Sequence, residues 1–162
     1  MVEVIHSAFG ARPRVDPPSD ADQETAQSLA AKLHHGSGIY AQVDGRPAGV
    51  IVVMPDRDGV ARFSRVSVHP DFQRHGIASA MVTAAEELAA IRGFTRAELL
   101  ARTEFPEFIG FWHHRGFIVD RRVEPGVILA KQLPLAIKVP TSDAMRLLGE
   151  RLAQLLRRGD VI

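Results

Sequence analysis

The chain has 162 residues, which corresponds to one domain large enough to bury its own hydrophobic core. Hydrophobic residues make up 46% and charged residues 24% of the sequence, a balance that excludes a disordered or fibrous chain. The net charge of +1 argues against a basic nucleic-acid-binding surface, and the absence of cysteine excludes disulfides, thiolate nucleophiles and zinc–thiolate sites. With no apolar segment long enough to span a bilayer and no signal-peptide pattern, we expect a cytoplasmic protein without membrane contact.

The first part of the chain predicts helices followed by an antiparallel meander. Residues 4–9 are apolar, and a loop with three prolines separates them from a helix expected between Asp20, as the N-cap, and His35. Three apolar, β-rich segments follow and predict strands: 39–43, 48–54 and 60–68. Asp44-Gly45 joins the first two, a dipeptide typical of a two-residue hairpin turn.

The hydrophobic period then changes to that of a long helix over 76–92, with Gly93 as its C-terminal cap. The apolar residues at helical spacing are Ile77, Ala80, Met81, Ala84, Leu88 and Ile91. The remaining predicted elements are a strand over 97–103, a helix from Pro106 to Arg115, and a hairpin of 117–124 and 127–133. This order predicts an α/β fold of the α+β type, with a central mixed β-sheet flanked by helices.

The segment from Val66 to Ala78 combines a strand, a polar loop and the start of the long helix. The amides of a helix's first turn lack internal partners and carry the positive end of the helix dipole, so they suit a phosphate. Gly76 leaves room for a ligand near the backbone, and Gln73, Arg74 and His75 add donors. The simpler alternative is a turn in which Gly76 only eases the geometry.

The spacing Gln73-x-x-Gly76-x-Ala78 resembles the pyrophosphate loop of the GNAT superfamily of acyl-CoA-dependent N-acetyltransferases. Residues 111–117, an aromatic helix that ends in Gly-Phe, resemble a second motif of that family. The resemblance covers about residues 1–134, which we expect to form a GNAT-like N-acetyltransferase domain with acetyl-CoA as its co-substrate. It further implies direct attack of a neutral amine on the thioester, a route that needs no enzyme nucleophile.

The resemblance also implies which residues bind the co-substrate. The backbones of Val66 and Val68 would pair with the pantetheine arm, and an N–H of this strand would stabilise the oxyanion. The amides from Gln73 to Ser79 would hold the pyrophosphate. The predicted cofactor-binding residues are Val66, Ser67, Val68, Gln73, Arg74, His75, Gly76, Ile77, Ala78 and Ser79.

The sequence does not identify which residues act as the catalytic acid and base. Family members often have a tyrosine four residues before the glycine of the Gly-Phe pair, whereas this chain has Trp112, whose indole cannot act as a proton acid. His113, His114, water or unassisted departure of the thiolate are the alternatives, and adjacent helical residues cannot both face one site. Glu98 and Glu104 flank the strand expected to line the cleft and are candidates for a base or an amine-binding group, with surface ion pairs as the alternative.

Residues 135–162 form a linker, an amphipathic helix and a truncated strand in this interpretation. Thr141 or Ser142 can cap the helix, and four of its apolar residues share one stripe. These residues are Met145, Leu148, Leu152 and Leu155. Residues 139–162 resemble the start of the ATPase of bacterial tRNA threonylcarbamoyladenosine synthesis, without its phosphate loop. The alternatives are the acetyltransferase half of a fusion, or a helix that packs on the domain or on a second copy of the chain.

We therefore predict a bacterial, cytoplasmic N-acetyltransferase that moves an acetyl group from acetyl-CoA to a primary amine of a small molecule or protein. The alternative is a non-catalytic acyl-CoA-binding regulatory module, which Trp112 in place of tyrosine keeps open. The expected partners are the amine substrate and, in a homodimer, a second copy; nucleic acid and membrane are not expected. The histidines lack His-x-x-x-His spacing, and the single Glu-x-x-His pair, Glu3 and His6, has no further ligand at metal-site spacing, so no metal site is predicted.

Overall fold

The computed structural model describes residues 1–134, 139 and 141–155, apart from the side chains of residues 151, 152, 154 and 155. Its helices are α1 (Val2–Gly10), η1 (Asp20–Gln23), α2 (Ala26–His35), η2 (Pro70–Phe72), α3 (Ile77–Ile91), α4 (Pro106–His114) and α5 (Ser142–Leu155). Its strands are β1 (Ser37–Val43), β2 (Arg46–Pro55), β3 (Val60–Val68), β4 (Arg96–Arg102), β5 (Ile118–Val123) and β6 (Gly126–Gln132).

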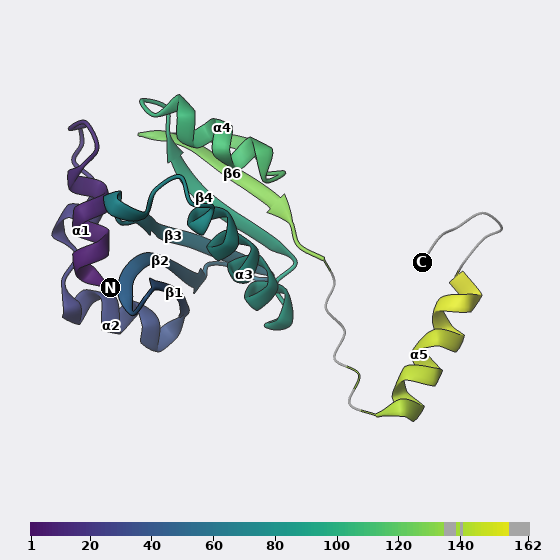
Figure 1. Ribbon diagram of the computed structural model, residues 1–162. Helices are drawn as coiled ribbons and strands as arrows, with labels where there is room; N and C mark the ends of the chain where they lie inside the picture. Colours follow the sequence, from purple (N-terminus) through teal and green to yellow (C-terminus); the bar gives the residue numbers. More distant parts are fainter. Residues whose placement is uncertain (135–138, 140, 156–162) are drawn as a thin grey trace.

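The six strands form one mixed sheet in the order β1-β2-β3-β4-β6-β5 (Figure 1). β3 and β4 are parallel, and all other neighbouring strands are antiparallel. The turn between β1 and β2 has positive φ at both Asp44 (49°) and Gly45 (75°), which matches the predicted two-residue hairpin. The predicted mixed sheet flanked by helices is therefore confirmed, including the predicted strands and the final hairpin.

Helices cover both faces of the sheet. α3 and α4 pack on one face, where they share a core with alternate residues of the strands, such as Ile51, Phe63 and Leu99. α1 and α2 pack on the other face, over the neighbouring residues Val50 and Val52 of β2. The alternation along β2 follows from the two-residue period of a strand, which points successive side chains to opposite faces.

Two expectations about the helices were wrong. Asp20 does not cap one long helix: Ser19 caps the short η1, and α2 starts at a capping box in which Thr25 and Ser28 exchange hydrogen bonds. The residues that α3 buries also differ from the predicted apolar stripe, because the helix is rotated about its own axis. They are Met81, Val82, Ala85, Ala89 and Ala90, whereas Ile91 is 77% exposed. Alanines let α3 lie close to the sheet, and this contact decides which residues are buried.

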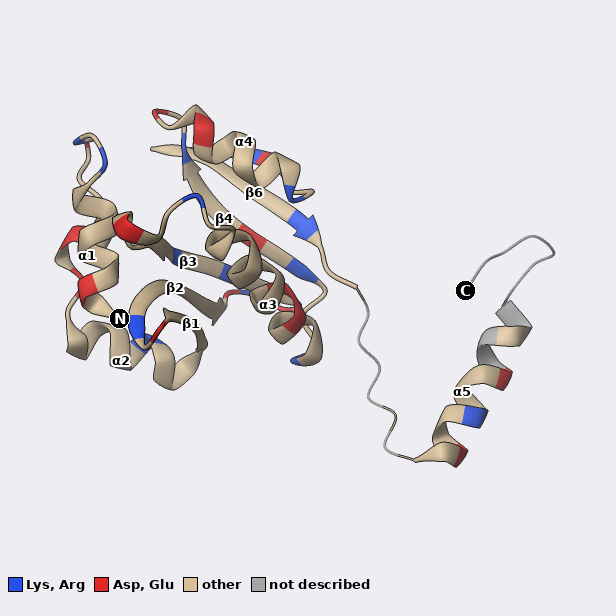
Figure 2. Ribbon diagram, in the orientation of Figure 1, with Lys and Arg blue, Asp and Glu red and all other residues tan. Residues whose placement is uncertain are grey.

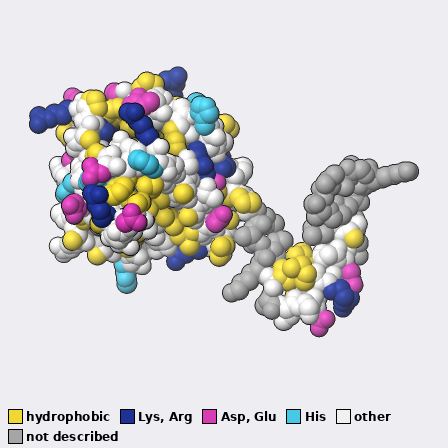
Figure 3. All heavy atoms as spheres, in the orientation of Figure 1, with side chains coloured by type: hydrophobic (Ala, Val, Ile, Leu, Met, Phe, Trp, Pro, Cys, Tyr) yellow, Lys and Arg dark blue, Asp and Glu magenta, His cyan; other side chains and the backbone are white. Residues whose placement is uncertain are grey.

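The tail contains the predicted helix. The N–H of Ala144 donates to the Thr141 hydroxyl at 3.1 Å, so Thr141 rather than Ser142 is the cap. Hydrophobic side chains lie on the surface of α5 beside charged ones, and Met145 and Leu147 are exposed (Figure 3). The predicted strand at 160–162 lies outside the described residues. Among the residues that are described, we find no helix with both the length and the apolar character needed to cross a membrane.

Candidate functional site

β3 and β4 pair only where they begin. Their register covers Val60–Arg62 of β3 against Arg96–Glu98 of β4, and beyond these residues the two strands diverge. In the described part of the chain, Phe63–Val68 therefore have a strand partner on the β2 side only. A strand edge without a partner presents N–H and C=O groups that an extended ligand can pair with.

A β-bulge lies on this part of β3. The register with β2 shifts between Val50 and Val52, and Arg65 has a φ of 54°. A bulge adds one residue to a strand and leaves backbone groups outside the regular ladder. Ser67, two residues after Arg65, is buried and donates its hydroxyl hydrogen to the Arg65 carbonyl. Only the backbone of Ser67 therefore remains for a ligand.

The start of α3 offers a second set of backbone groups. The first hydrogen bond of the helix runs from the Ala80 N–H to the Gly76 carbonyl, and the amides of Ile77, Ala78 and Ser79 have no acceptor among the described residues. Gly76 has a φ of 76°, and a Cβ added there would meet no atom within 4 Å. The loop in front is exposed, and Gln73 donates to the Val68 carbonyl at 3.4 Å. This helix start is open and suited to an anion.

These two sets of groups are eight residues apart in the chain and joined by η2. The structure thus brings the predicted residues 66–68 and 73–79 to the same end of the β3–α3 unit. The model of the acetyltransferase (GNAT) family matches residues 2–117. The chain belongs to this family.

Solved structures of acetyltransferases have the same fold. The PaiA N-acetyltransferase of Thermoplasma acidophilum, solved with coenzyme A, is 15% identical, with a TM-score of 0.69 over 81% of this chain and 89% of the other. The ribosomal-protein-S18-alanine N-acetyltransferase of Escherichia coli is 17% identical, with a TM-score of 0.66 over 85% and 88%. A Bacillus subtilis acetyltransferase in complex with CoA is 16% identical, with a TM-score of 0.59 over 69% and 85%. A sequence search of curated proteins gives no match.

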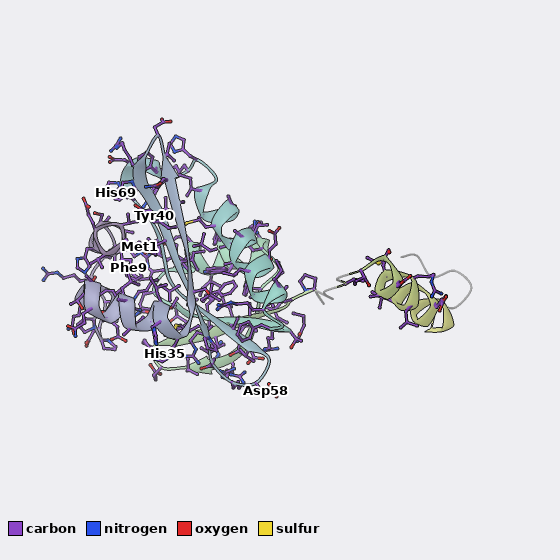
Figure 4. All side chains as sticks on the ribbon, turned by 90° about the horizontal axis from the view of Figure 1, so that it is seen from below. Met1, Phe9, His35, Tyr40, Asp58 and His69 are labelled. Carbon is purple, nitrogen blue, oxygen red and sulfur yellow. The ribbon has the colours of Figure 1, made fainter. Side chains whose placement is uncertain are left out.

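Family membership confirms the predicted enzyme class, an N-acetyltransferase with acetyl-CoA as co-substrate. It leaves the roles of individual residues to be argued from geometry. Trp112, at the position of the family's tyrosine, is 5% exposed and belongs to the core. Its ring lies edge-on to Phe117 at 4.9 Å and to Phe111 at 5.2 Å between centroids. Tyr40, the only tyrosine, lies on β1 far along the chain from α4, and Figure 4 labels it there.

The two histidines at the end of α4 are exposed. The His114 ring lies 2.7 Å from the Gly110 carbonyl through its Nδ1, the contact expected of a residue at a helix C-terminus. The His69 ring similarly caps η2, because its Nδ1 accepts from the Asp71 N–H at 3.3 Å. Neither contact prepares a histidine to protonate a thiolate.

Glu98 has the environment of a structural ion pair. Its side chain is 1% exposed and accepts hydrogen bonds from Arg57, Arg96 and Arg121 (Figure 2 shows the basic residues around this part of β4). Burial alone would raise the pKa of Glu98, but the three guanidinium groups outweigh it and lower the pKa to about 2. A carboxylate with so low a pKa is a poor proton acceptor, which argues against Glu98 as the catalytic base.

Glu104 is exposed and pairs with Arg102, whose guanidinium lies 2.7 Å from it and lowers the pKa of the carboxyl. The same guanidinium donates to the Pro17 carbonyl at 2.6 Å and to the Asp16 carbonyl at 3.0 Å. These hydrogen bonds hold the proline-rich loop after α1, residues 11–19, against the end of β4, where β3 and β4 diverge. Glu104 helps to orient Arg102 through this ion pair.

Sequence reasoning missed two side chains near the diverging strands. Glu24 is buried and accepts hydrogen bonds from Lys32, Ser28 and Arg65; burial alone would raise its pKa, yet these donors lower it to about 2. The spacing of Glu24, Ser28 and Lys32 by four residues is a signal that the sequence does contain. Arg12 donates to the Val66 carbonyl at 3.3 Å, and nothing in its sequence neighbourhood indicates this contact.

Proposed function

We propose that acetyl-CoA binds along the free edge of β3 and across the start of α3. The backbones of Val66 and Val68 would pair with the pantetheine arm, and the amides from Gly76 to Ser79 would hold the pyrophosphate. The support comes from a strand edge and a helix start whose backbone groups have no partner among the described residues, and which lie on one continuous β3–α3 unit. The neighbours solved with coenzyme A make this ligand the natural occupant.

The chemistry follows from this placement. A neutral primary amine attacks the thioester carbon, and the oxyanion that forms is stabilised by an N–H of the bulged segment around Ser67. The C–N bond is made and the C–S bond is broken. The amine's proton passes to water, and water protonates the departing thiolate, since the tyrosine position is occupied by the core residue Trp112 and both α4 histidines are solvated.

The single observation that carries the proposal is the open helix start at Gly76, and α3 itself provides the matched control. Gly76 and Gly93 lie at opposite ends of the helix, both with positive φ and both with no atom within 4 Å of an added Cβ. Gly76→Asp and Gly93→Asp therefore carry a similar backbone strain of about 1–2 kcal/mol. Only the first places a carboxylate where the pyrophosphate would bind.

Isothermal titration with acetyl-CoA separates the two variants. We expect Gly76→Asp to weaken binding about 100-fold or more, because two anions would compete for one set of amides, and Gly93→Asp to bind within about 3-fold of the parent. Equal affinities for the two variants would show that the pyrophosphate binds elsewhere. Release of free thiol over a panel of amines then tests transfer, and binding without thiol release would favour the non-catalytic module.

We further propose that residues 1–134 form the catalytic domain and residues 135–162 a separate tail. The family model ends at residue 117, and α5 keeps apolar side chains exposed, which supports a role in contacting another polypeptide. A phosphate-loop sequence directly downstream in the gene would support a fusion with the tRNA-modification ATPase. A concentration-dependent dimer that is lost on truncation after residue 134 would instead support a homodimer formed by α5.

A further inference from the structure

The loop after α1 places a cation beside the free edge of β3. Arg12 donates to the Val66 carbonyl at 3.3 Å, and its guanidinium carbon lies 3.9 Å from the centre of the Phe9 ring and 4.7 Å from that of Phe108. Phe9 belongs to α1, on one face of the sheet (labelled in Figure 4), whereas Phe108 belongs to α4, on the other. Arg12 therefore lies where the two faces meet, at the opening between β3 and β4.

The Arg12 guanidinium has few hydrogen-bond partners and no close counter-ion among the described residues. It has five N–H donors, and the contact with Val66 is its one hydrogen bond to the part of the chain that the structure describes. No carboxylate of the described residues lies within 4.0 Å of it. Burial lowers the pKa of Arg12, and the more distant charges of Asp22 and Glu107 oppose this effect. A partly desolvated cation without a close counter-ion is costly unless an anion joins it.

The donor substrate does not provide that anion in the proposed site. The pyrophosphate would bind at the start of α3, beyond Val68, while Arg12 lies at Val66, where the thioester end of the pantetheine is placed. The Val66 carbonyl has two lone pairs, so it can accept from Arg12 and from the pantetheine at once. The remaining donors of Arg12 therefore lie beside the proposed position of the thioester.

The geometry points to Arg12 as the site that binds a carboxylate of the acceptor, so that the substrate is a small amine with a carboxylate a few bonds from its nitrogen, as in an α-amino acid. This inference rests on the proposed function. A monoanion fits better than a phosphate dianion, because one guanidinium supplies the positive charge and Asp22 and Glu107 add negative charge nearby. A planar guanidinium also matches the two oxygens of a carboxylate.

Steady-state transfer with matched amines tests this inference. The probes are α-amino acids and their carboxamides, which keep the side chain and the amine but lose the anion. The amide's amine is less basic and more of it is neutral, so chemistry alone favours the amide. We expect the full chain to prefer the acid by about 10- to 100-fold in kcat/KM, mainly through KM. A preference for the amide would overturn the assignment.

Substitutions locate the effect. Arg12→Met keeps an apolar chain between the two rings and should remove the preference for the acid, while Arg12→Lys should keep part of it. Arg14→Met, in the same exposed loop, is the control and should leave the preference unchanged. Weaker acetyl-CoA binding in Arg12→Met with an unchanged acid-to-amide ratio would place Arg12 in the donor site and contradict the inference.

A binding measurement keeps the test independent of turnover. In the presence of CoA, N-acetyl amino acids, which are the expected products, should bind about 10-fold or more tightly than their amides, and Arg12→Met should abolish the difference. Absence of thiol release with every amine would count against the proposed function alone. Equal binding of the acid and the amide would overturn the carboxylate site even if transfer occurs.

Discussion

The proposed donor side and acceptor side of the cleft are built from different kinds of groups. The donor side consists of backbone amides and carbonyls of β3 and α3, all within residues 60–79. The acceptor side consists of side chains from distant segments: Arg12 in the loop after α1, Arg102 at the end of β4 and Phe108 in α4. Backbone groups can bind a ligand whatever the local side chains are, whereas side chains can make the acceptor specific to this chain.

Glu24 gives the largest expected effect, because its ion pairs hold the bulge of β3 on the donor side. Its carboxylate connects α2, through Lys32, to the bulge of β3, through Arg65, and is fully buried. Glu24→Gln should lower the free energy of unfolding by about 3–4 kcal/mol, since two cations lose a buried partner. Denaturant unfolding measures it, with Glu150→Gln, in an exposed pair with Arg146, as the control expected to cost less than about 0.5 kcal/mol.

The same network predicts how stability depends on acid. The pKa of Glu24 is about 2 in the folded protein, below its ordinary value of 4.5, so its contribution is fully present above pH 4.5 and is lost as the pH falls toward 2. Glu98 has the same shift and the same sign. Between these pH values the unfolding free energy of Glu24→Gln should therefore fall less steeply with acid. The difference in slope corresponds to about one proton fewer taken up on unfolding. An unchanged slope would contradict the ion pairs.

Arg102 tests the acceptor side alone. Arg102→Met removes the contacts with the Pro17 and Asp16 carbonyls and should release the loop that carries Arg12. We expect the KM for the amine to rise about 3- to 10-fold while the affinity for acetyl-CoA stays unchanged, because one or two hydrogen bonds are lost far from the helix start. Arg62→Met, which removes only an exposed ion pair with Asp56, is the control. A loss confined to acetyl-CoA binding would contradict the division into two sides.

Trp112→Tyr should have the smallest effect on catalysis. The residue lies in the core against Phe117, where a tyrosine hydroxyl would be surrounded by apolar side chains. We expect kcat to change less than about 2-fold and stability to fall by about 1–2 kcal/mol, because a smaller ring leaves a cavity. A large increase in kcat together with a new ionisation in its pH profile would show that the position serves as an acid site.

The sequence predicts more of the donor side than of the acceptor side. The strand–loop–helix unit of the donor side is contiguous, so its residues carry the family resemblance that implies both the fold and the ligand. The acceptor side depends on contacts between residues far apart in the chain, such as Arg12 with Val66, 54 positions away. For Glu98 the sequence leaves a catalytic base and an ion pair open, and only the fold, which brings Arg57, Arg96 and Arg121 to its side chain, favours the ion pair. Which face of α3 is buried also depends on how the helix packs against the sheet, which the sequence pattern alone does not give.

Amide hydrogen exchange with and without acetyl-CoA tests whether backbone groups of β3 and α3 hold the co-substrate. We expect protection on binding at two places, the free edge of β3 at residues 66–68 and the start of α3 at residues 76–79. The amides of the β1–β2 turn at Asp44 and Gly45 should be unaffected. Protection at neither place, or protection confined to the loop after α1, would contradict this expectation.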